Sequence, residues 1–313
     1  MLPEKRKLNI LVDILGNSYR SGNELLFFCP KCKHHKRKLS VNVDKDAFKC
    51  WVCDYHGRSI RRLVRRYGSF NQRAEWDEIT GRVDLNLFGE DLFGEEEKRE
   101  EQKIKLPEEF ISLTNDSLPI HARPAIKYLR NRGITNKDIT RWKIGYCPAG
   151  EYSGRIVIPS FGSSGYCNYF VSRTYSSDWP KYKNPQISRD IVFNHLYVDW
   201  DSDLVLVEGV FDAIVSGPNS VPLLGSSIRE GAELFQEIVK NDTPVYVALD
   251  PDAEKKSMYL INKLLEYGIE VYKINISPYG DVGEMTREIF NERKKEAVLM
   301  SGDNYLLRAI NSI

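Results

Sequence analysis

Hydrophobic residues in the second half of the chain form short uninterrupted runs that end in acidic residues. Residues 204–212 read LVLVEGVFD, and residues 245–252 read VYVALDPD. Apolar runs without alternation are typical of strands buried on both faces, as in a parallel sheet. Similar runs at 220–224 and 270–276 alternate with helical patterns. We therefore expect an α/β subdomain with a parallel sheet and right-handed crossovers.

Three acids follow the ends of two of these expected strands. Glu208 ends the first run, and Asp250 and Asp252 end the second. Ligands of open α/β sheets bind at the carboxyl ends of strands, so we expect these carboxylates to lie together. Crowded carboxylates repel one another unless a cation joins them, and Mg²⁺ and Mn²⁺ prefer oxygen ligands. The pattern predicts a magnesium or manganese site, with solvated loop acids as the alternative.

The N-terminal part of the chain has short strand patterns around two pairs of cysteines. Cys29 and Cys32 form one C-x2-C pair, and Cys50 and Cys53 form another seventeen residues later. This spacing predicts a small β zinc ribbon in which four thiolates complete a structural, tetrahedral site. Free core thiols and a redox pair are the alternatives. A neighbouring histidine in place of one cysteine is a further alternative, with three candidates: His34, His35 and His56.

Charge is balanced overall but concentrated locally. The chain has 45 basic and 44 acidic residues, so its net charge indicates no partner. Residues 29–67 carry twelve basic and only three acidic residues. The aromatic residues interspersed there are Phe48, Trp51, Tyr55 and Tyr67. Cations neutralise phosphates and aromatic rings stack on unpaired bases, so this region is predicted to bind single-stranded nucleic acid, with a merely solvated basic face as the alternative.

The middle of the chain separates two folded regions. Residues 68–105 are acidic with few periodic apolar positions, which favours a flexible linker or, alternatively, a docking peptide. A second folded region begins at residue 106, with helices expected at 124–132 and 135–142. A hairpin with its turn at 162–165 follows.

Several classes of protein are not expected from the composition. Six cysteines in 313 residues do not indicate a disulfide scaffold, and a reducing cytosolic setting fits them. No apolar run approaches eighteen residues, so we expect neither a signal peptide nor a membrane span. A phosphate-binding G-x4-G-K-[ST] motif does not occur, so we expect no fused helicase.

The motifs resemble a known family when taken in order. EGVFD followed by DPD resembles the Toprim domain of primases, topoisomerases and some nucleases. CPKC, SVN and FKCWVC resemble the zinc-binding domain of DnaG-type and phage primases, and four cysteines without histidine resemble several phage enzymes. WKIGYCP and PKYKNP resemble segments of the primase polymerase domain. The resemblance covers nearly the whole chain apart from the linker.

The resemblance implies a domain order and further site residues. It implies a zinc ribbon at 1–67, the acidic linker, an α+β basic half at 106–202, a Toprim subdomain at 203–290 and a helical tail at 291–313. Asp281 and Glu284 lie where primases carry further acids. Five residues resemble the half that holds template and nucleotide phosphates: Arg155, Arg173, Lys181, Lys183 and Asn184. Ordinary surface cations are the alternative for each.

The expected function is DNA primase activity, which is the synthesis of short RNA primers on single-stranded DNA. The partners implied are the template, ribonucleoside triphosphates and a separate replicative helicase. The expected setting is the cytoplasm at a replication fork, or the host cytoplasm for a phage protein. A RecR-like mediator that clamps DNA without catalysis and a Toprim nuclease are the alternatives.

Overall fold

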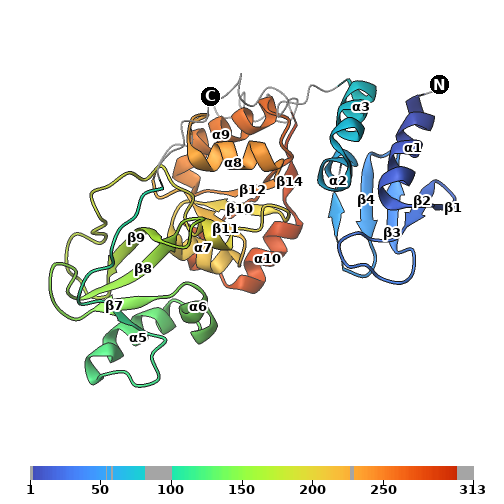
Figure 1. The fold of residues 1–313 in the computed structure, drawn as a ribbon. Coiled ribbons are helices and arrows are strands. Elements are labelled where there is room, and N and C mark those ends of the chain that lie inside the picture. Colours follow the sequence, from blue (N-terminus) through green and yellow to red (C-terminus); the bar gives the residue numbers. More distant parts are fainter. Residues whose placement is uncertain (1–2, 54, 58, 82–100, 226–228, 302–313) are drawn as a thin grey trace. The chain divides into compact units, whose positions relative to one another are not determined.

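The structure is a computed structural model that describes residues 3–53, 55–57, 59–81, 101–225 and 229–301 (Figure 1). The chain divides into two compact units, Met1–Glu95 and Glu96–Ile313, which we call the N-terminal and C-terminal units. Each unit has its own sheets and core, so each is described separately. No helix among the described residues combines the length and the apolar character needed to cross a bilayer.

The N-terminal unit is a small antiparallel sheet with three helices packed together. Its strands, in spatial order, are β1 (Tyr19–Ser21), β2 (Glu24–Phe27), β3 (Leu39–Asn42), β4 (Ala47–Cys50) and β5 (His56–Gly57). Its helices are α1 (Pro3–Leu15), α2 (Arg61–Tyr67) and α3 (Phe70–Thr80). Leu11, Phe27, Leu39 and Leu63 are fully buried in one core, together with the first cysteine of each pair. The expected zinc-ribbon type of sheet is present.

Helix α3 lies inside the segment that the sequence predicts to be a linker. Ser69 caps it by accepting from the backbone N–H of Gln72. Trp76 is buried in the core, and the carboxylate of Asp77 accepts from Nε of buried Arg61 at 2.6 Å. The linker prediction is therefore wrong for this segment, because one buried ring and one buried ion pair hold a helix that has little apolar periodicity.

The other end of the predicted linker belongs to the C-terminal unit. The backbone N–H of Ile104 donates to the carbonyl of Cys167 at 2.9 Å. The side chain of Gln102 donates to the carbonyl of Asn168 at 2.8 Å. Residues 101–105 are thus attached to the edge of a sheet. The remainder of the predicted linker, residues 82–100, lies outside the described residues.

The C-terminal unit contains an antiparallel and a mainly parallel sheet. The antiparallel sheet is formed by β6 (Ile111–Ser112), β7 (Gly145–Cys147), β8 (Arg155–Phe161) and β9 (Cys167–Thr174). Helices α5 (Arg123–Asn131) and α6 (Asn136–Arg141) precede β7, close to the predicted ranges. The hairpin between β8 and β9 turns at residues 162–166, as predicted. This sheet and its helices form the basic half that the resemblance implies.

The second sheet has the spatial order β11 (Ser220–Pro222), β10 (Leu204–Val207), β12 (Val245–Ala248), β13 (Val271–Lys273) and β14 (Val298–Leu299). The first four of these strands are parallel, and β14 is antiparallel to β13. Helices α8 (Glu233–Asn241) and α9 (Glu254–Glu266) cover one face (Figure 1). Helices α7 (Val210–Ser216) and α10 (Arg287–Lys295) cover the other. The predicted fold class is confirmed.

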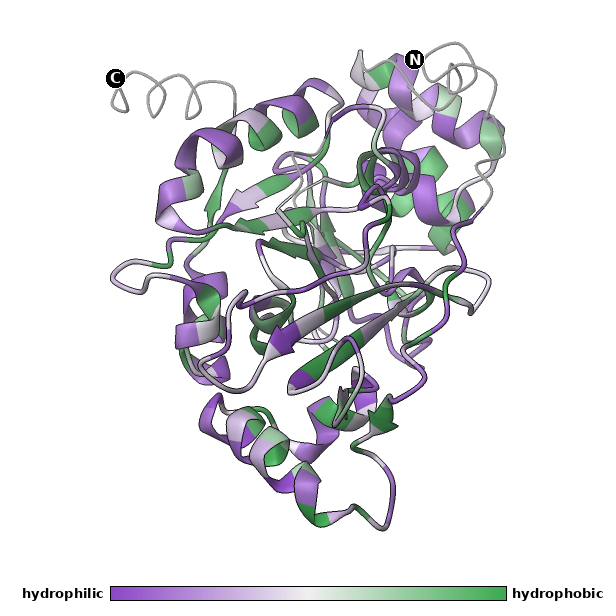
Figure 2. Cartoon of the chain, turned by 90° about the vertical axis from the view of Figure 1, so that its left-hand side faces the viewer, coloured by the Kyte–Doolittle hydropathy of each residue, from purple (hydrophilic) through white to green (hydrophobic). Residues whose placement is uncertain are grey.

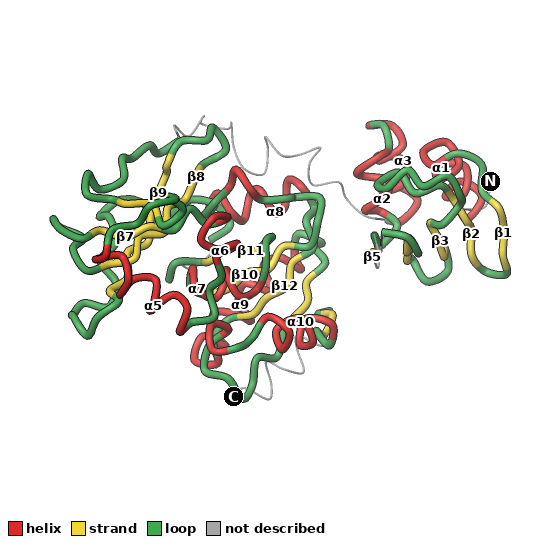
Figure 3. Tube along the Cα trace, turned by 90° about the horizontal axis from the view of Figure 1, so that it is seen from below, coloured by secondary structure: helices red, strands yellow, loops and turns green. Residues whose placement is uncertain are grey.

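Burial explains why the apolar runs form the central strands. All four residues of β10 are buried, and the strands of this sheet are largely green in Figure 2, whereas the helices carry both colours. Figure 3 shows the same strands with helices on both sides. A strand covered on both faces has no polar side, which is why the run LVLV shows no alternation.

The helical tail predicted at 291–313 is wrong in its first part. Helix α10 ends at Lys295, and the chain then returns as β14. Leu299 pairs with Tyr272 of β13, and the N–H of Met300 donates to the carbonyl of Val271 at 2.8 Å. Strand β13 thus forms backbone hydrogen bonds with residues 298–300, which it could not form with a helix. Residues 302–313 lie outside the described residues.

Candidate active site and metal centres

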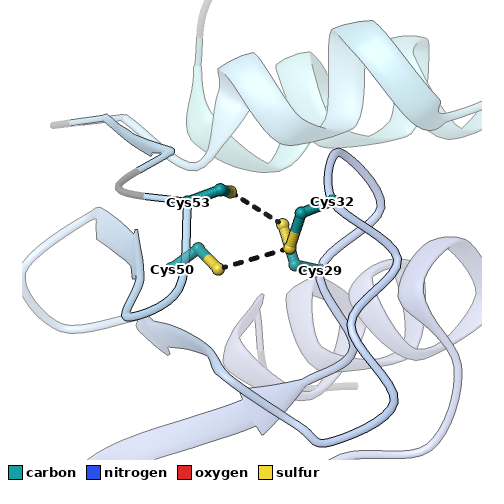
Figure 4. Close-up of side chains that lie close together, drawn as sticks. All are labelled: Cys29, Cys32, Cys50 and Cys53. Carbon is teal, nitrogen blue, oxygen red and sulfur yellow. Dashed lines mark hydrogen bonds between the residues drawn. The ribbon is translucent and has the colours of Figure 1, made fainter.

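The four paired cysteines converge at one end of the N-terminal sheet. Cys29 and Cys32 follow β2, whereas Cys50 ends β4 and Cys53 lies just beyond it. The Sγ atoms of Cys29 and Cys53 are 3.8 Å apart, and those of Cys32 and Cys50 are 3.9 Å apart (Figure 4). All four sulfurs lie within 4.8 Å of one another. The pairs of a tetrahedral Zn–S site with bonds of about 2.3 Å are separated by about 3.8 Å, so the cluster fits zinc.

The chemistry of the cluster also favours a bound cation. Burial raises the pKa of the Cys29 thiol to about 12, so a thiolate at this position requires a positive charge beside it. The potential metal group found in the described part of this unit contains these four cysteines and no histidine. His34 instead accepts from the N–H of Lys36, and His56 is exposed on β5. The donor set therefore fits a closed structural zinc site.

Only some of the aromatic residues predicted to bind nucleic acid reach the surface. Phe48 and Tyr55 are buried in the core, and Tyr67 packs against it. Trp51 is 68% exposed, and the ammonium of Lys49 lies 5.2 Å from the centre of its ring. Phe28, which was not among the predicted residues, is 41% exposed and has the guanidinium of Arg37 4.7 Å from its ring centre. Its position next to the first cysteine was the available signal.

The three strand-end acids meet in the C-terminal unit. Strands β10 and β12 are parallel neighbours, with Val207 opposite Ala248, so their carboxyl ends lie side by side. Glu208, Asp250 and Asp252 each offer an oxygen within 4.8 Å of the others. Glu208 and Asp250 are half-buried and Asp252 is exposed. The arrangement leaves an open side, which a closed structural site lacks.

Electrostatic repulsion is strong in this acidic cluster. The pKa of Asp250 is raised to about 7, first by burial and then by the charges of Asp212 and Glu208, with Asp281 and Asp252 adding less. One buried carboxylate oxygen of Asp250, Oδ1, has no hydrogen-bond partner. A buried acceptor without a donor and a raised carboxylate pKa both indicate a place for a cation. The donor set is all oxygen, which suits Mg²⁺ or Mn²⁺.

Asp212 is a buried member of the site that sequence analysis did not assign. It lies on the first turn of α7, and its carboxylate accepts from the N–H of Gly209 at 2.8 Å and of Gly283 at 3.0 Å. Burial and the charge of Asp281 raise its pKa to about 6. The signal was present in EGVFD, because an acid four residues after Glu208 returns to the strand end on the first helical turn.

The two weaker acid candidates differ in their surroundings. The charge of Asp281 raises the pKa of both Asp212 and Asp250, so Asp281 lies close enough to belong to the cluster electrostatically. A Cβ on Gly283 would lie 3.2 Å from Oδ1 of Asp281 and 3.0 Å from Oδ1 of Asp212, so this glycine lies close to both carboxylates. Glu284 instead accepts from the N–H of Gly280 at 2.9 Å and closes its own loop. It is not part of the three-acid group.

Comparisons with known proteins find DNA primases that are similar to this chain. No family model matches the chain. The DNA primase of Thermotoga maritima is 23% identical over 331 residues, which covers 90% of this chain and 58% of that protein. The DNA primase of Aquifex aeolicus is 24% identical over 354 residues, which covers 96% of this chain and 69% of that protein. The chain is a relative of the DnaG-type DNA primases.

Solved primase structures share the fold. The DnaG primase catalytic domain bound to single-stranded DNA matches 61% of this chain and 76% of that chain, with a TM-score of 0.53 and 18% identity. The Escherichia coli primase catalytic core matches with a TM-score of 0.52 and the same identity, covering 61% of this chain and 78% of that one. The chain spans 58%, 69% and 46% of the lengths of three primase relatives, that is, about half to two thirds.

The basic residues that the primase resemblance implied are mostly engaged within the fold. Arg155 is buried and donates to the backbone carbonyls of residues 180 and 181. The side-chain oxygen of Asn184 accepts from the N–H of Ser172. Lys183 lies 3.3 Å from the carboxylate of Glu151, whereas Lys181 is exposed. The structure therefore places Arg155 and Asn184 as supports of a loop rather than at its surface.

Two arginines lie beside the acidic cluster. Arg173 donates to the phenol oxygen of Tyr182 at 2.6 Å, and its guanidinium is 5.1 Å from the ring centre of Phe211. Arg132 lies 4.8 Å from the same ring, and its charge offsets a small part of the rise in the pKa of Asp212. Arg173 was among the predicted residues, whereas Arg132, which follows α5 in the sequence RNRG, was not. Phe211 brings both cations near the acids because it directly precedes Asp212.

Proposed function

We propose that the chain synthesises RNA primers on single-stranded DNA as a DNA primase. The observation that carries this proposal is the group of Glu208, Asp250 and Asp252 at adjacent parallel strand ends, within a fold shared with primase catalytic domains. The curated relatives named DNA primase support it over most of the chain. The reaction is the attack of a 3′-hydroxyl on the α-phosphate of an incoming nucleotide, with pyrophosphate leaving.

The acids have distinct parts in this proposal. Glu208, Asp250 and Asp252 bind one or two Mg²⁺ or Mn²⁺ ions, which when bound lower the pKa of the attacking hydroxyl and neutralise charge on the phosphates. Asp212 and Asp281 make the electrostatic potential at the three ligands more negative, which strengthens the binding of a cation there. Lys256, whose ammonium is 3.9 Å from Oε1 of Glu208, orients that carboxylate.

The cations have complementary parts. Lys181, Lys183 and Arg173 neutralise phosphates of the template and the nucleotide near the acids, and Arg132 joins them. In the N-terminal unit, four zinc-bound thiolates maintain the fold that presents Trp51 and the surrounding cations. The exposed ring stacks on unpaired template bases whatever their sequence, and we propose that the unit as a whole is also the reader of template sequence.

A primer-synthesis assay tests the proposal directly. The full chain is incubated with single-stranded template, labelled ribonucleoside triphosphates and Mg²⁺ or Mn²⁺, and short RNA is resolved by electrophoresis. We expect RNA products with the wild type and none with Asp250→Ala or without the divalent ion. Absence of product with the wild type, on templates of varied sequence and with either metal, contradicts the proposal.

The alternatives predict other products in the same assay. A Toprim nuclease would shorten the DNA template, and a RecR-like mediator would bind DNA without changing either strand. The relatives that cover most of this chain are named primases, so neither alternative is favoured. We further propose that a separate replicative helicase is a partner and that the protein acts at replication forks in the cytoplasm.

A further inference from the structure

The most exposed large hydrophobic side chain among the described residues lies in the C-terminal unit, outside the acidic cluster. Trp179 is 88% exposed. Single exposed apolar residues are common on protein surfaces and need no explanation by themselves. A binding role for Trp179 requires in addition that its backbone is held in place and that suitable groups lie next to it.

The segment that follows Trp179 is fixed by buried groups. Arg155, only 6% exposed, donates from Nη2 to the carbonyl of Pro180 at 2.8 Å. The N–H of Thr174 donates to the carbonyl of Lys181 at 3.1 Å, and the N–H of Lys183 donates to the carbonyl of Ser172 at 3.0 Å. Residues 181–183 therefore pair along the end of β9. A buried guanidinium is costly to leave unpaired, so the hydrogen bonds of Arg155 stabilise this position of the loop.

The segment also borders the acidic cluster. Tyr182, three residues after Trp179, accepts from Nη1 of Arg173 at 2.6 Å, and Arg173 lies over Phe211 at 5.1 Å. Burial raises the pKa of Tyr182, and the nearby charge of Asp212 adds to this effect. Three residues of chain span at most about 10 Å. The backbone of Trp179 therefore lies within about 10 Å of that of Tyr182, and exposed Lys181 lies between the two in the sequence.

We propose that Trp179 is a stacking platform for one unpaired base of the template strand, and that Lys181 binds an adjacent phosphate. This inference rests on the proposed primase function and adds a base-contacting residue that is separate from the zinc unit. An aromatic face with a neighbouring cation is the combination that binds single strands irrespective of sequence. Arg155 and Asn184 are positioning residues for this platform, because their hydrogen bonds hold the backbone that follows Trp179.

Equilibrium binding of a labelled oligothymidylate of about 12 nucleotides to the full chain tests the stacking role without any catalysis. We expect Trp179→Ala to weaken binding about 10-fold and Trp179→Phe to retain most of the affinity. Removal of a ring releases no counterion, so the salt dependence stays unchanged in Trp179→Ala. Lys181→Ala instead reduces the slope of log K against log salt by about one.

Tyr166→Ala is the matched control. Tyr166 is 58% exposed, has the ammonium of Lys103 at 4.3 Å from its ring centre, and lies in the turn at the opposite end of β9. That end is about 24 Å away along the strand. Binding by this variant should equal that of the wild type. Equal losses in Tyr166→Ala and Trp179→Ala, or no loss in Trp179→Ala with unchanged melting temperature, overturn the proposal.

Kinetics distinguish the template from the nucleotide. In the primer assay we expect Trp179→Ala to raise KM for the template about 10-fold while KM for the nucleotide and kcat remain within about twofold. An increase confined to KM for the nucleotide overturns the template assignment. The two proposals can fail separately, because binding is measured without catalysis. If the wild type makes no primer while Trp179→Ala still weakens oligothymidylate binding, only the proposed function is refuted.

Discussion

The two candidate metal centres of this chain are built for different purposes. The sulfur cluster has four candidate ligand residues, two of them buried, with sulfur separations of 3.8 and 3.9 Å in two cross-pairs. The carboxylate cluster has three ligand residues that are half-buried or exposed, and a buried oxygen without a donor. A full tetrahedral set of thiolates leaves no place for substrate, whereas a partial set of carboxylates does.

The surrounding units differ in the same way. The N-terminal unit is small, and two of its cysteines, Cys29 and Cys50, are part of its hydrophobic core. In the C-terminal unit, buried apolar side chains such as Leu206, Val247 and Ile261 form the core around the parallel sheet, and the acids are not part of this core. We therefore expect a metal to stabilise the first unit and, under the proposed function, to serve chemistry in the second. The following predictions separate these two roles.

The largest expected effect is on catalysis. Asp250→Ala and Asp252→Ala should each lower primer synthesis by at least about 100-fold, because they remove ligands for the ion that stabilises charge in the transition state. Binding of single-stranded DNA should change little, since cations hold the template. Asp116→Ala, a change of an exposed acid outside the cluster, should leave synthesis unchanged. Near wild-type synthesis by either cluster variant would remove the metal assignment.

The next effect is on folding of the N-terminal unit. Cys50→Ser should abolish stoichiometric zinc and unfold this unit, because binding of a structural zinc supplies much of the folding free energy of so small a domain. Calorimetry should show loss of one transition, with the transition of the C-terminal unit retained. Cys167→Ser, which changes a thiol outside the cluster, should keep the zinc. Full zinc occupancy in Cys50→Ser would contradict the assigned ligand set.

The same contrast explains what the sequence alone could predict. Both clusters depend on local spacing, either two C-x2-C pairs or acids that directly follow apolar strands. Such signals survive without knowledge of the tertiary structure. Asp212 could have been predicted in the same way, because it lies one helical turn after Glu208. It was not predicted, because acids were sought only at strand ends and Asp212 lies on a helix.

Properties set by tertiary packing could not be predicted. Helix α3 depends on the burial of Trp76 and on the ion pair of Arg61 with Asp77, and no periodic pattern announces either. Charge in a sequence does not show which way a side chain points. Arg155 was therefore assigned to phosphate binding, although it lies buried against a loop. Exposure of Trp51 and burial of Tyr55, close in the sequence, show the same limit for aromatic residues.

A truncation tests whether the two units have separate roles. A chain that lacks residues 1–81 should extend a supplied primer slowly, since the acids and the cations of the C-terminal unit remain. Initiation at preferred template sites should fall by at least about 10-fold, because the aromatic and basic surface around Trp51 is gone. Addition of the separate N-terminal unit should restore initiation only near millimolar concentration, as expected when a tether is lost. Unchanged site choice would refute a reading role.

The smallest expected effect concerns the stability of the metal-free C-terminal unit. The pKa of Asp250 is raised from 3.8 to about 7, mainly by burial, so the folded state binds this proton more tightly than the unfolded state. Ionisation then makes folding less favourable, and stability falls as the pH rises from about 4 to about 7. With a chelator at pH 7.5, Asp250→Asn should therefore raise the melting temperature of this unit by about 2–3 °C, after allowance for solvent screening.

The gain should disappear under two conditions that follow from the same cause. At pH 4, Asp250 is protonated in the wild type, so the two proteins should melt together. With Mg²⁺ in excess, the wild type should gain stability from binding while Asp250→Asn gains little, which reverses their order. Asp252→Asn, at an exposed position, should lose the Mg²⁺ effect without the metal-free gain. A wild type that melts at the same temperature with and without Mg²⁺ would show that the acids repel one another without holding the ion.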